Sequence, residues 1–211
     1  MRELKSDLFG TIWRVHRGHA IVIRDTTSAR WWTAGIARSL CRREGRALAR
    51  LDGQSGTPRL LVVTPASLQR EWIEGWPMHI AKPRNADYFK AARALLVRLH
   101  RRGVAHNDAA KEPNWLVTPA GQPALVDFQL ACVASRRGRL FRALAREDLR
   151  HLLKHKRRYC PARLTARERR ILAEPAPFSR LWRFLAKPAY NFVTRQLFGW
   201  ADREGASDRR Y

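Results

Sequence analysis

The chain has few cysteines, few acidic residues and no long apolar run. Its three cysteines, Cys41, Cys132 and Cys160, are far apart, so their spacing supports neither a metal site nor a disulfide framework. Such use of cysteine is typical of a reducing cytoplasm. No apolar run approaches the ~18 residues of a membrane-spanning helix, and the N-terminal stretch MRELKSDLFG has no apolar signal core. We therefore expect a cytoplasmic location.

Acidic residues are greatly outnumbered by basic ones. The 211 residues include 18 Asp and Glu against 42 Lys and Arg, which gives a formal net charge of +24. A surplus of this size attracts polyanions such as nucleotides, anionic lipid headgroups or nucleic acid, but does not choose among them. No recognised nucleic-acid-binding motif is present, so we do not expect nucleic acid as the partner. With 45% hydrophobic residues, the chain can form a core.

The first half of the chain predicts a small sheet and one helix. Residues 8–15 and 20–24 are β-prone and are separated by a turn at Arg17-Gly18-His19. Residues 36–51 repeat apolar positions at helical spacing: Ile36, Leu40, Ala47, Leu48 and Leu51. Glu44 is the only acid in this helix, and we expect it to pair with Arg24, the basic residue that ends the strand Ile21-Val22-Ile23-Arg24. Residues 59–63 predict a buried strand.

The second half carries the residues with chemical potential. Residues 86–102 predict a helix that stops at Gly103. His106 and Asp108 follow, then Asn114, and Asp127 comes after the apolar strand Ala124-Leu125-Val126. A carboxylate can orient a hydroxyl group, and an amide with a second carboxylate can hold Mg²⁺, which prefers a few oxygen ligands. These are the side chains that phosphoryl transfer requires.

This pattern resembles the catalytic half of protein-kinase-type phosphotransferases. Residues 99–106 match the pattern L-H-x-x-G-x-x-H that precedes the kinase catalytic loop, and Asp127-Phe128 matches the start of D-F-G. Over about residues 5 to 160 the chain is similar to small bacterial kinase-like proteins related to RIO-type atypical kinases and to lipopolysaccharide core kinases. The resemblance implies an α+β, two-lobed kinase-like fold, with a small antiparallel β upper lobe at 1–73 and a trimmed, mainly helical lower lobe at 74–211.

The resemblance also implies roles around the transferred phosphate. Asp108 is the expected catalytic aspartate, and Asn114 and Asp127 are the expected Mg²⁺ ligands. Lys111 lies between them and could approach the transferred phosphate. His106 is expected to support the loop rather than to transfer protons.

For ATP, the resemblance implies a second group of residues in the upper lobe. Gly10 occupies the place of the glycine-rich loop, although the full G-x-G-x-x-G is absent. Arg24 stands where kinases have the ATP-binding lysine, with Glu44 as its partner. The segment 68–75 resembles the hinge between lobes, where the backbone of Glu71 and Ile73 would contact adenine.

Three departures from the kinase pattern limit what the resemblance implies. The first is Arg24 itself, whose planar fork differs from an ammonium group. Asn114 follows Asp108 by six residues rather than five, and Gln129 replaces the glycine of D-F-G, which indicates a fixed segment. No A-P-E motif follows, and residues 135–146 are basic, so a regulated activation segment is not expected.

Beyond the catalytic motifs, Asp148 lies in a predicted helix at 147–156. It is either a brace for the catalytic loop or a simple first-turn acid. Thr165 and Glu168 predict a capping box. Residues 178–200 are aromatic and basic, which is typical both of an interfacial membrane helix and of a final helix packed on the lower lobe.

The sequence therefore predicts an ATP- and Mg²⁺-dependent phosphotransferase, closest to a RIO-like serine/threonine kinase. One alternative is a lipopolysaccharide core sugar kinase at the inner membrane face, where the basic aromatic segment would contact the anionic surface. The acceptor is thus a protein or a lipid-linked sugar. A second alternative is a non-catalytic, kinase-like scaffold that binds nucleotide.

Overall fold

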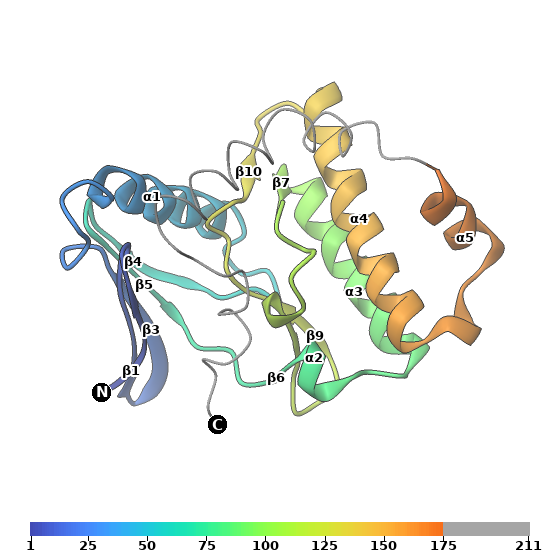
Figure 1. The fold of residues 1–211 in the computed structure, drawn as a ribbon, viewed down its shortest axis with the longest axis horizontal. Coiled ribbons are helices and arrows are strands. Elements are labelled where there is room, and N and C mark those ends of the chain that lie inside the picture. Colours follow the sequence, from blue (N-terminus) through green and yellow to red (C-terminus); the bar gives the residue numbers. More distant parts are fainter. Residues whose placement is uncertain (175–211) are drawn as a thin grey trace. The chain divides into compact units, whose positions relative to one another are not determined.

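The computed structural model describes residues 1–174, and the predicted segment 178–200 lies outside them (Figure 1). Met1–Arg163 forms one compact unit, and the described residues from Leu164 onwards belong to a second unit. In the second unit, α5 (Ala166–Ala173) begins with the predicted capping box. The Thr165 hydroxyl accepts from the Glu168 N–H at 3.2 Å, and the Glu168 carboxylate accepts from the Thr165 N–H at 2.8 Å.

A five-stranded antiparallel sheet opens the first unit (Figure 1). Its strands lie in the order β1-β2-β3-β5-β4. Their bounds are β1 Arg2–Asp7, β2 Gly10–Arg17, β3 His19–Asp25, β4 Leu60–Val63 and β5 Ser67–Glu71. The predicted hairpin is confirmed, because β2 and β3 pair through the turn at Gly18. Val22 and Leu68 are buried on one face of the sheet, and Ile21 is buried on the opposite face.

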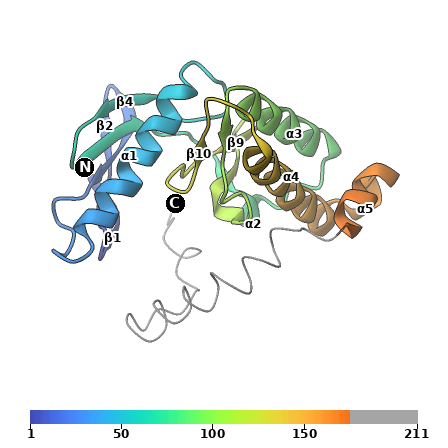
Figure 2. The same cartoon turned by 90° about the horizontal axis from the view of Figure 1, so that it is seen from above.

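Helix α1 (Ala34–Arg50) packs against β4 and β5 (Figures 1 and 2). Its buried side is formed by Ala37, Cys41, Glu44, Ala47 and Leu48. Ile36, predicted for the apolar stripe, is instead 57% exposed. Successive helical residues turn by about 100°, so burying Ala37 and Cys41 directs Ile36 outwards.

The rest of the first unit is mainly helical, with α3 (Ala86–Arg101) and α4 (Arg139–Tyr159) side by side (Figures 1 and 2). The predicted α3 is confirmed, and its N-cap Asn85 accepts from the Asp87 N–H at 2.8 Å. Helix α4 starts eight residues before the predicted 147, because Phe141 is buried and anchors its first turn. Two small sheets complete this part. One contains β6 (Trp76–Pro77), β8 (Trp115–Val117) and β9 (Pro123–Leu125), and the other pairs β7 (Val104–Ala105) with β10 (Cys132–Val133). The short helix α2 (Met78–Ala81) and two 3₁₀ turns, Glu112–Asn114 and Pro161–Arg163, are the other elements of the described chain.

Strand β4 corrects the prediction of a buried strand at 59–63. It is the last strand of the sheet and pairs with β5 alone among the described strands. Leu61, Val62 and Val63 are 37%, 43% and 48% exposed. A continuous apolar run cannot distinguish a strand buried on both faces from an exposed edge, and here the edge position decides.

One apolar core joins the sheet side to the helical side. Leu48, Leu51 and Leu68 belong to the same buried cluster as Met78 and Leu96. The predicted lobe boundary at 73/74 therefore lies within the compact unit Met1–Arg163. None of the helices in the described part of the chain is long and apolar enough to cross a membrane.

Acid should destabilise this fold through His151 on α4. Burial, helped by the charge of Lys154, lowers the pKa of His151 to about 4, whereas an unfolded histidine titrates near ~6.5. The folded state thus binds fewer protons than the unfolded state between these two values. The free energy of unfolding should therefore fall as the pH drops from ~6.5 towards ~4, by at most about 3 kcal/mol.

Urea unfolding at about pH 7 and about pH 4.5 measures this loss. His151→Gln should remove the part of this pH-dependent fall in the free energy of unfolding that His151 causes. His19→Gln, a change at an exposed histidine of β3, should leave the fall unchanged. The same acid loss in wild type and His151→Gln would contradict the prediction.

Candidate active site

Asp108 and Asn114 meet in the loop that follows β7. The Asn114 amide nitrogen donates to the Asp108 carboxylate at 3.0 Å and to the Asp108 carbonyl at 3.1 Å. Lys111 lies 2.9 Å from the same carboxylate. Two successive turns, Lys111 N–H to Asp108 O and Asn114 N–H to Lys111 O, compact the loop. These turns absorb the six-residue spacing that the sequence showed as a departure.

His106 supports this loop from the protein interior. Its side chain is fully buried, and its ring packs edge-on against Phe128, with centroids 4.7 Å apart. Nδ1 accepts from the Asp108 N–H at 3.3 Å, so Nε2 carries the proton and donates to the Val126 carbonyl at 3.0 Å. Both ring nitrogens are engaged, as expected for a supporting residue.

Asp148 braces the loop from α4, which confirms one of the two predicted roles. Its carboxylate accepts from the backbone N–H groups of His106 at 2.8 Å and Asn107 at 2.9 Å, and it also lies 3.1 Å from His100 Nε2. Asp148 is 1% exposed. Asn107 has φ +60°, a left-handed conformation that asparagine tolerates better than most residues. Asp148 therefore fixes the backbone of the two residues that precede Asp108.

Asp127 is brought next to this loop by the strand before it. The Val126 N–H donates to the Asn114 carbonyl at 2.9 Å, and His106 holds the Val126 carbonyl. Asp127 has φ +66°, a left-handed conformation that aspartate, like asparagine, adopts more readily than most residues. Its Oδ1 is buried and receives no hydrogen bond from the described atoms.

The predicted Arg24–Glu44 pair is present, and a second arginine joins it. Glu44 is fully buried, and its two carboxylate oxygens lie 3.1 Å from Arg24 Nε and 3.2 Å from Arg70 Nε. Arg24 also approaches Asp127, at 4.0 Å. The guanidinium of Arg24 thus spans the space between helix α1 and the end of β9.

Gln129 completes the surroundings of Arg24. With its amide oxygen turned towards β3, Gln129 accepts hydrogen bonds from the Arg24 guanidinium. The residue in the place of the kinase glycine therefore ties this segment to the sheet, consistent with the fixed segment that its identity predicted.

Burial raises the pKa of each of the two aspartates, and neighbouring positive charge lowers it. Burial raises the pKa of Asp108 and prevails over the opposing effect of Lys111. Burial also raises the pKa of Asp127, but Arg24 and then Lys111 outweigh it, so this pKa lies below its ordinary value. Asp127 is thus held as a carboxylate, the form that a cation would require.

The residues present fit a Mg²⁺ ion that is also bound by phosphate. Asn114 uses its amide nitrogen for Asp108, so its amide oxygen is the atom that remains as a ligand. The buried Oδ1 of Asp127 is the second oxygen. Within residues 1–174, no group of three or more His, Cys, Asp and Glu side chains could hold a metal by itself. With only two oxygen ligands from the protein, a Mg²⁺ ion would need phosphate and water oxygens to complete its octahedral coordination.

The remaining predicted residues lie in the sheet and the segment after it. Gly10 has φ +121°, and a Cβ there would lie 2.1 Å from the Asp25 carbonyl, so the close approach of β3 requires glycine at this position. The Glu71 N–H donates to the Arg59 carbonyl at 2.9 Å, so this N–H is engaged at the end of β5 and is not available for adenine. Ile73 packs against the small apolar cluster of Leu116, Ala124 and Val126, just before Asp127.

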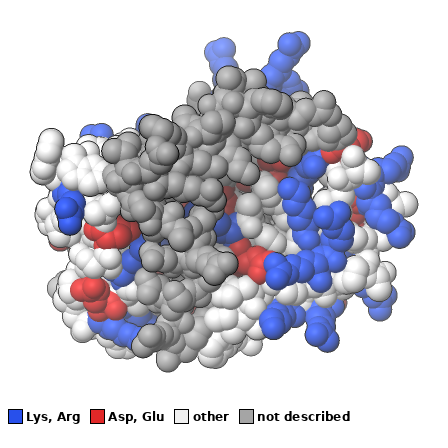
Figure 3. Space-filling model, viewed as in Figure 1, with Lys and Arg blue, Asp and Glu red and all other residues white. Residues whose placement is uncertain are grey.

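Two surface hollows are present elsewhere. One lies between α1 and β4 and the other between α3 and α4, and neither is lined by Asp108 or Asp127. The face seen in Figure 3 carries many Lys and Arg side chains and few acidic ones, in keeping with the net charge.

Arg70 is the contact residue that sequence reasoning missed. Its burial is set by the register of β5, where exposure alternates and Leu68 and Arg70 are the two buried residues. A charged side chain on the inward face of a strand requires a partner, and Glu44 was the one acid of the facing helix.

Replacing Glu44 should strongly destabilise the protein. Glu44→Gln keeps the shape of the side chain but leaves Arg24 and Arg70 without a counter-charge in a buried position. We expect a loss of about 3 kcal/mol in the free energy of unfolding, since breaking a buried ion pair from one side typically costs that much. Urea unfolding measures it, with the exposed neighbour change Arg43→Gln as control. A loss below about 0.5 kcal/mol, the ordinary range for surface changes, would contradict the importance assigned to this carboxylate.

Comparison with known proteins gave no match, neither to a protein-family model nor to a curated protein sequence. The geometry described above is therefore the basis on which function can be argued.

Proposed function

We propose that the protein is an ATP- and Mg²⁺-dependent phosphotransferase with a kinase-like, two-lobed arrangement, closest to a RIO-like serine/threonine kinase. The observation that carries the proposal is the junction of three groups. Asp108 is hydrogen-bonded to Asn114, and Asp127 lies beside them within reach of Arg24. Asp127 thus faces the fixed charge of Arg24 and lies near enough to Asp108 for their charges to interact, which gathers the groups that phosphoryl transfer uses.

The arrangement of elements supports the proposal independently of the site. An antiparallel sheet with α1 against it supplies Arg24 and Glu44, and the mainly helical part supplies Asp108 and Asn114. Asp127 follows β9 and meets both groups. Nucleotide and acceptor would therefore be contacted from different parts of one compact unit.

Asp108 is positioned to act on the acceptor. An alcohol that hydrogen-bonds to its carboxylate would be oriented for in-line attack on the γ-phosphorus. As the new O–P bond forms, the bond from phosphorus to the β–γ bridging oxygen breaks, ADP leaves, and the hydroxyl proton passes to Asp108. Burial raises the pKa of this carboxylate, which favours proton acceptance. Lys111 adds positive charge beside the transferred group.

Asn114 and Asp127 supply the oxygens for the metal, and Mg²⁺ bound there would neutralise charge on the phosphates. Arg24 is held by Glu44 on one side and faces Asp127 and Gln129 on the other. Phosphate oxygens would compete with Gln129 for its guanidinium, which makes bidentate contacts to such oxygens readily.

The acceptor class is proposed as a protein serine or threonine, with a lipid-linked sugar as the alternative. Both carry the alcohol group that the chemistry requires. The surplus of positive charge favours an anionic acceptor or an anionic surface in either case.

A non-catalytic, nucleotide-binding scaffold is the second candidate function. It is favoured by the contacts of Arg24, because Glu44, Asp127 and Gln129 all engage the guanidinium that would otherwise bind phosphate. The two functions differ in one measurable respect: a scaffold binds ATP without turnover.

Asp127→Ala and Asp108→Asn should each lower phosphotransfer by about 10²-fold or more, because each removes a group that acts on the reacting phosphate or hydroxyl. The measurement is transfer of radiolabel from ATP to a protein extract and to a cell-envelope extract, with wild type and variants side by side. Asp87→Asn, a change at an exposed acid in the first turn of α3, is the matched control and should retain full transfer.

Wild-type transfer that requires Mg²⁺ and is lost in both variants supports the phosphotransferase. Label in the envelope extract alone would favour the lipid-linked sugar. Nucleotide binding without transfer, unchanged by Asp108→Asn, would contradict the phosphotransferase and favour the scaffold.

A further inference from the structure

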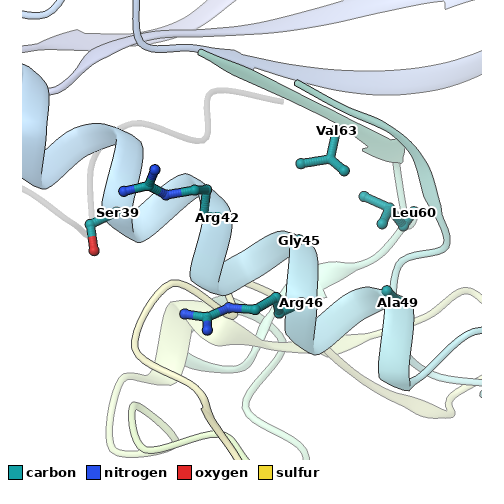
Figure 4. A pocket seen from close by; sticks show the side chains of 7 residues that line it. All are labelled: Ser39, Arg42, Gly45, Arg46, Ala49, Leu60 and Val63. Carbon is teal, nitrogen blue, oxygen red and sulfur yellow. The ribbon is translucent and has the colours of Figure 1, made fainter. Parts of the chain in front are cut away.

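A hollow of about 540 Å³ lies between helix α1 and strand β4, away from the candidate active site (Figure 4). It is lined by Ser39, Arg42, Gly45, Arg46, Ala49, Leu60 and Val63. Gly45 lets the strand come close, since a Cβ at this position would lie 3.0 Å from a methyl group of Val63. The hollow therefore has an apolar floor where α1 and β4 meet.

Strand β4 beside this hollow is an exposed edge. It ends the sheet order, and its one described strand partner is β5. Leu61, Val62 and Val63 are between 37% and 48% exposed, in one continuous run. An exposed apolar edge strand is a template for pairing with another extended chain, and proteins normally avoid leaving one uncovered. The edge thus favours a peptide as the occupant.

Charge indicates the composition of that peptide. Arg42 and Arg46 line the hollow from α1, and Figure 4 shows their side chains extending along the helix, away from Leu60 and Val63. Both side chains are exposed, as are Arg38 and Arg43 on the same helix. An occupant that covers the floor places its own polar groups against arginines, so acidic residues complement them.

We propose that the α1–β4 hollow docks an extended segment of a partner protein that carries apolar residues, flanked by acidic ones, at every second position. The segment adds to the sheet as a strand beside β4, so every second side chain points to the face that carries α1. On that face its apolar side chains fill the hollow over Leu60 and Val63, and its acidic side chains meet Arg42 and Arg46. Main-chain pairing provides affinity, and the alternating side chains provide specificity. This proposal is independent of the phosphotransfer chemistry.

The test uses the full chain and a short fluorescein-labelled peptide that has leucine, flanked by glutamate, at every second position and serine at the positions between them. Arg42→Glu/Arg46→Glu should weaken binding, measured by fluorescence anisotropy, by about tenfold or more. Arg38→Glu/Arg43→Glu reverses the same number of charges on the same helix and should change affinity by less than about threefold. Ala49→Trp fills the hollow without a change of charge and should also abolish tight binding.

Hydrogen exchange provides the second readout. Peptide binding should slow exchange of the backbone amides of Leu60–Val63, and a peptide N-methylated at alternate amides should bind weakly and give no such slowing. Equal weakening in the two charge-reversal variants would overturn the proposal, because binding would then follow net charge alone. Unchanged exchange in β4 would overturn it as well. Binding of phosphatidylglycerol vesicles that Ala49→Trp abolishes, with no peptide binding, would replace the peptide by a lipid surface.

Discussion

The carboxylate of Glu44 is the interaction on which the candidate site depends. It is fully buried and is held between Arg24 of β3 and Arg70 of β5, so one acid fixes helix α1 against two strands. A buried carboxylate is tolerated only when charge and geometry compensate its desolvation, and two guanidinium groups provide this compensation. The same contact orients Arg24 towards Asp127. The packing of α1 on the sheet thus determines the position of the Arg24 guanidinium beside Asp127.

A second buried acid has the corresponding role in the helical part. The Asp148 carboxylate accepts hydrogen bonds from two backbone N–H groups of the loop that carries Asp108. The His106 ring links the same loop to the Val126 carbonyl, just before Asp127. The shape of the loop therefore depends on contacts from neighbouring elements as well as on the hydrogen bonds within it. Backbone conformations that are costly for ordinary residues, at Asn107 and Asp127, are held by these contacts from neighbouring elements.

The sequence predicted the elements with strong periodicity and the residues with a single available partner. Helices α1 and α3 and the β2–β3 hairpin follow from their patterns, and Glu44 was paired with Arg24 because it was the only acid in its helix. Sequence reasoning did not find Arg70, because a second arginine on one carboxylate follows from the register of β5 against β3 rather than from any local signal.

Exposure was harder to predict than secondary structure. The run Leu60–Val63 was expected to be buried, yet its position at the end of the sheet leaves it exposed, and strand order is a property of the whole fold. The start of α4 was missed for a related reason. The stretch 135–146 was interpreted as a basic segment because of its arginines, and the burial of Phe141 shows that its second half is anchored as the start of a helix.

The use of arginine rather than lysine at position 24 has a consequence for the range of conditions in which the site keeps its charge. A lysine ammonium group enclosed in this way can release its proton near neutrality, whereas a guanidinium group does not do so in proteins. Around Arg24, burial alone would lower its pKa, but Glu44 and Asp127 more than reverse that effect. The cation opposite Asp127 is thus permanent, so contacts made through it should not vary with cellular acidity.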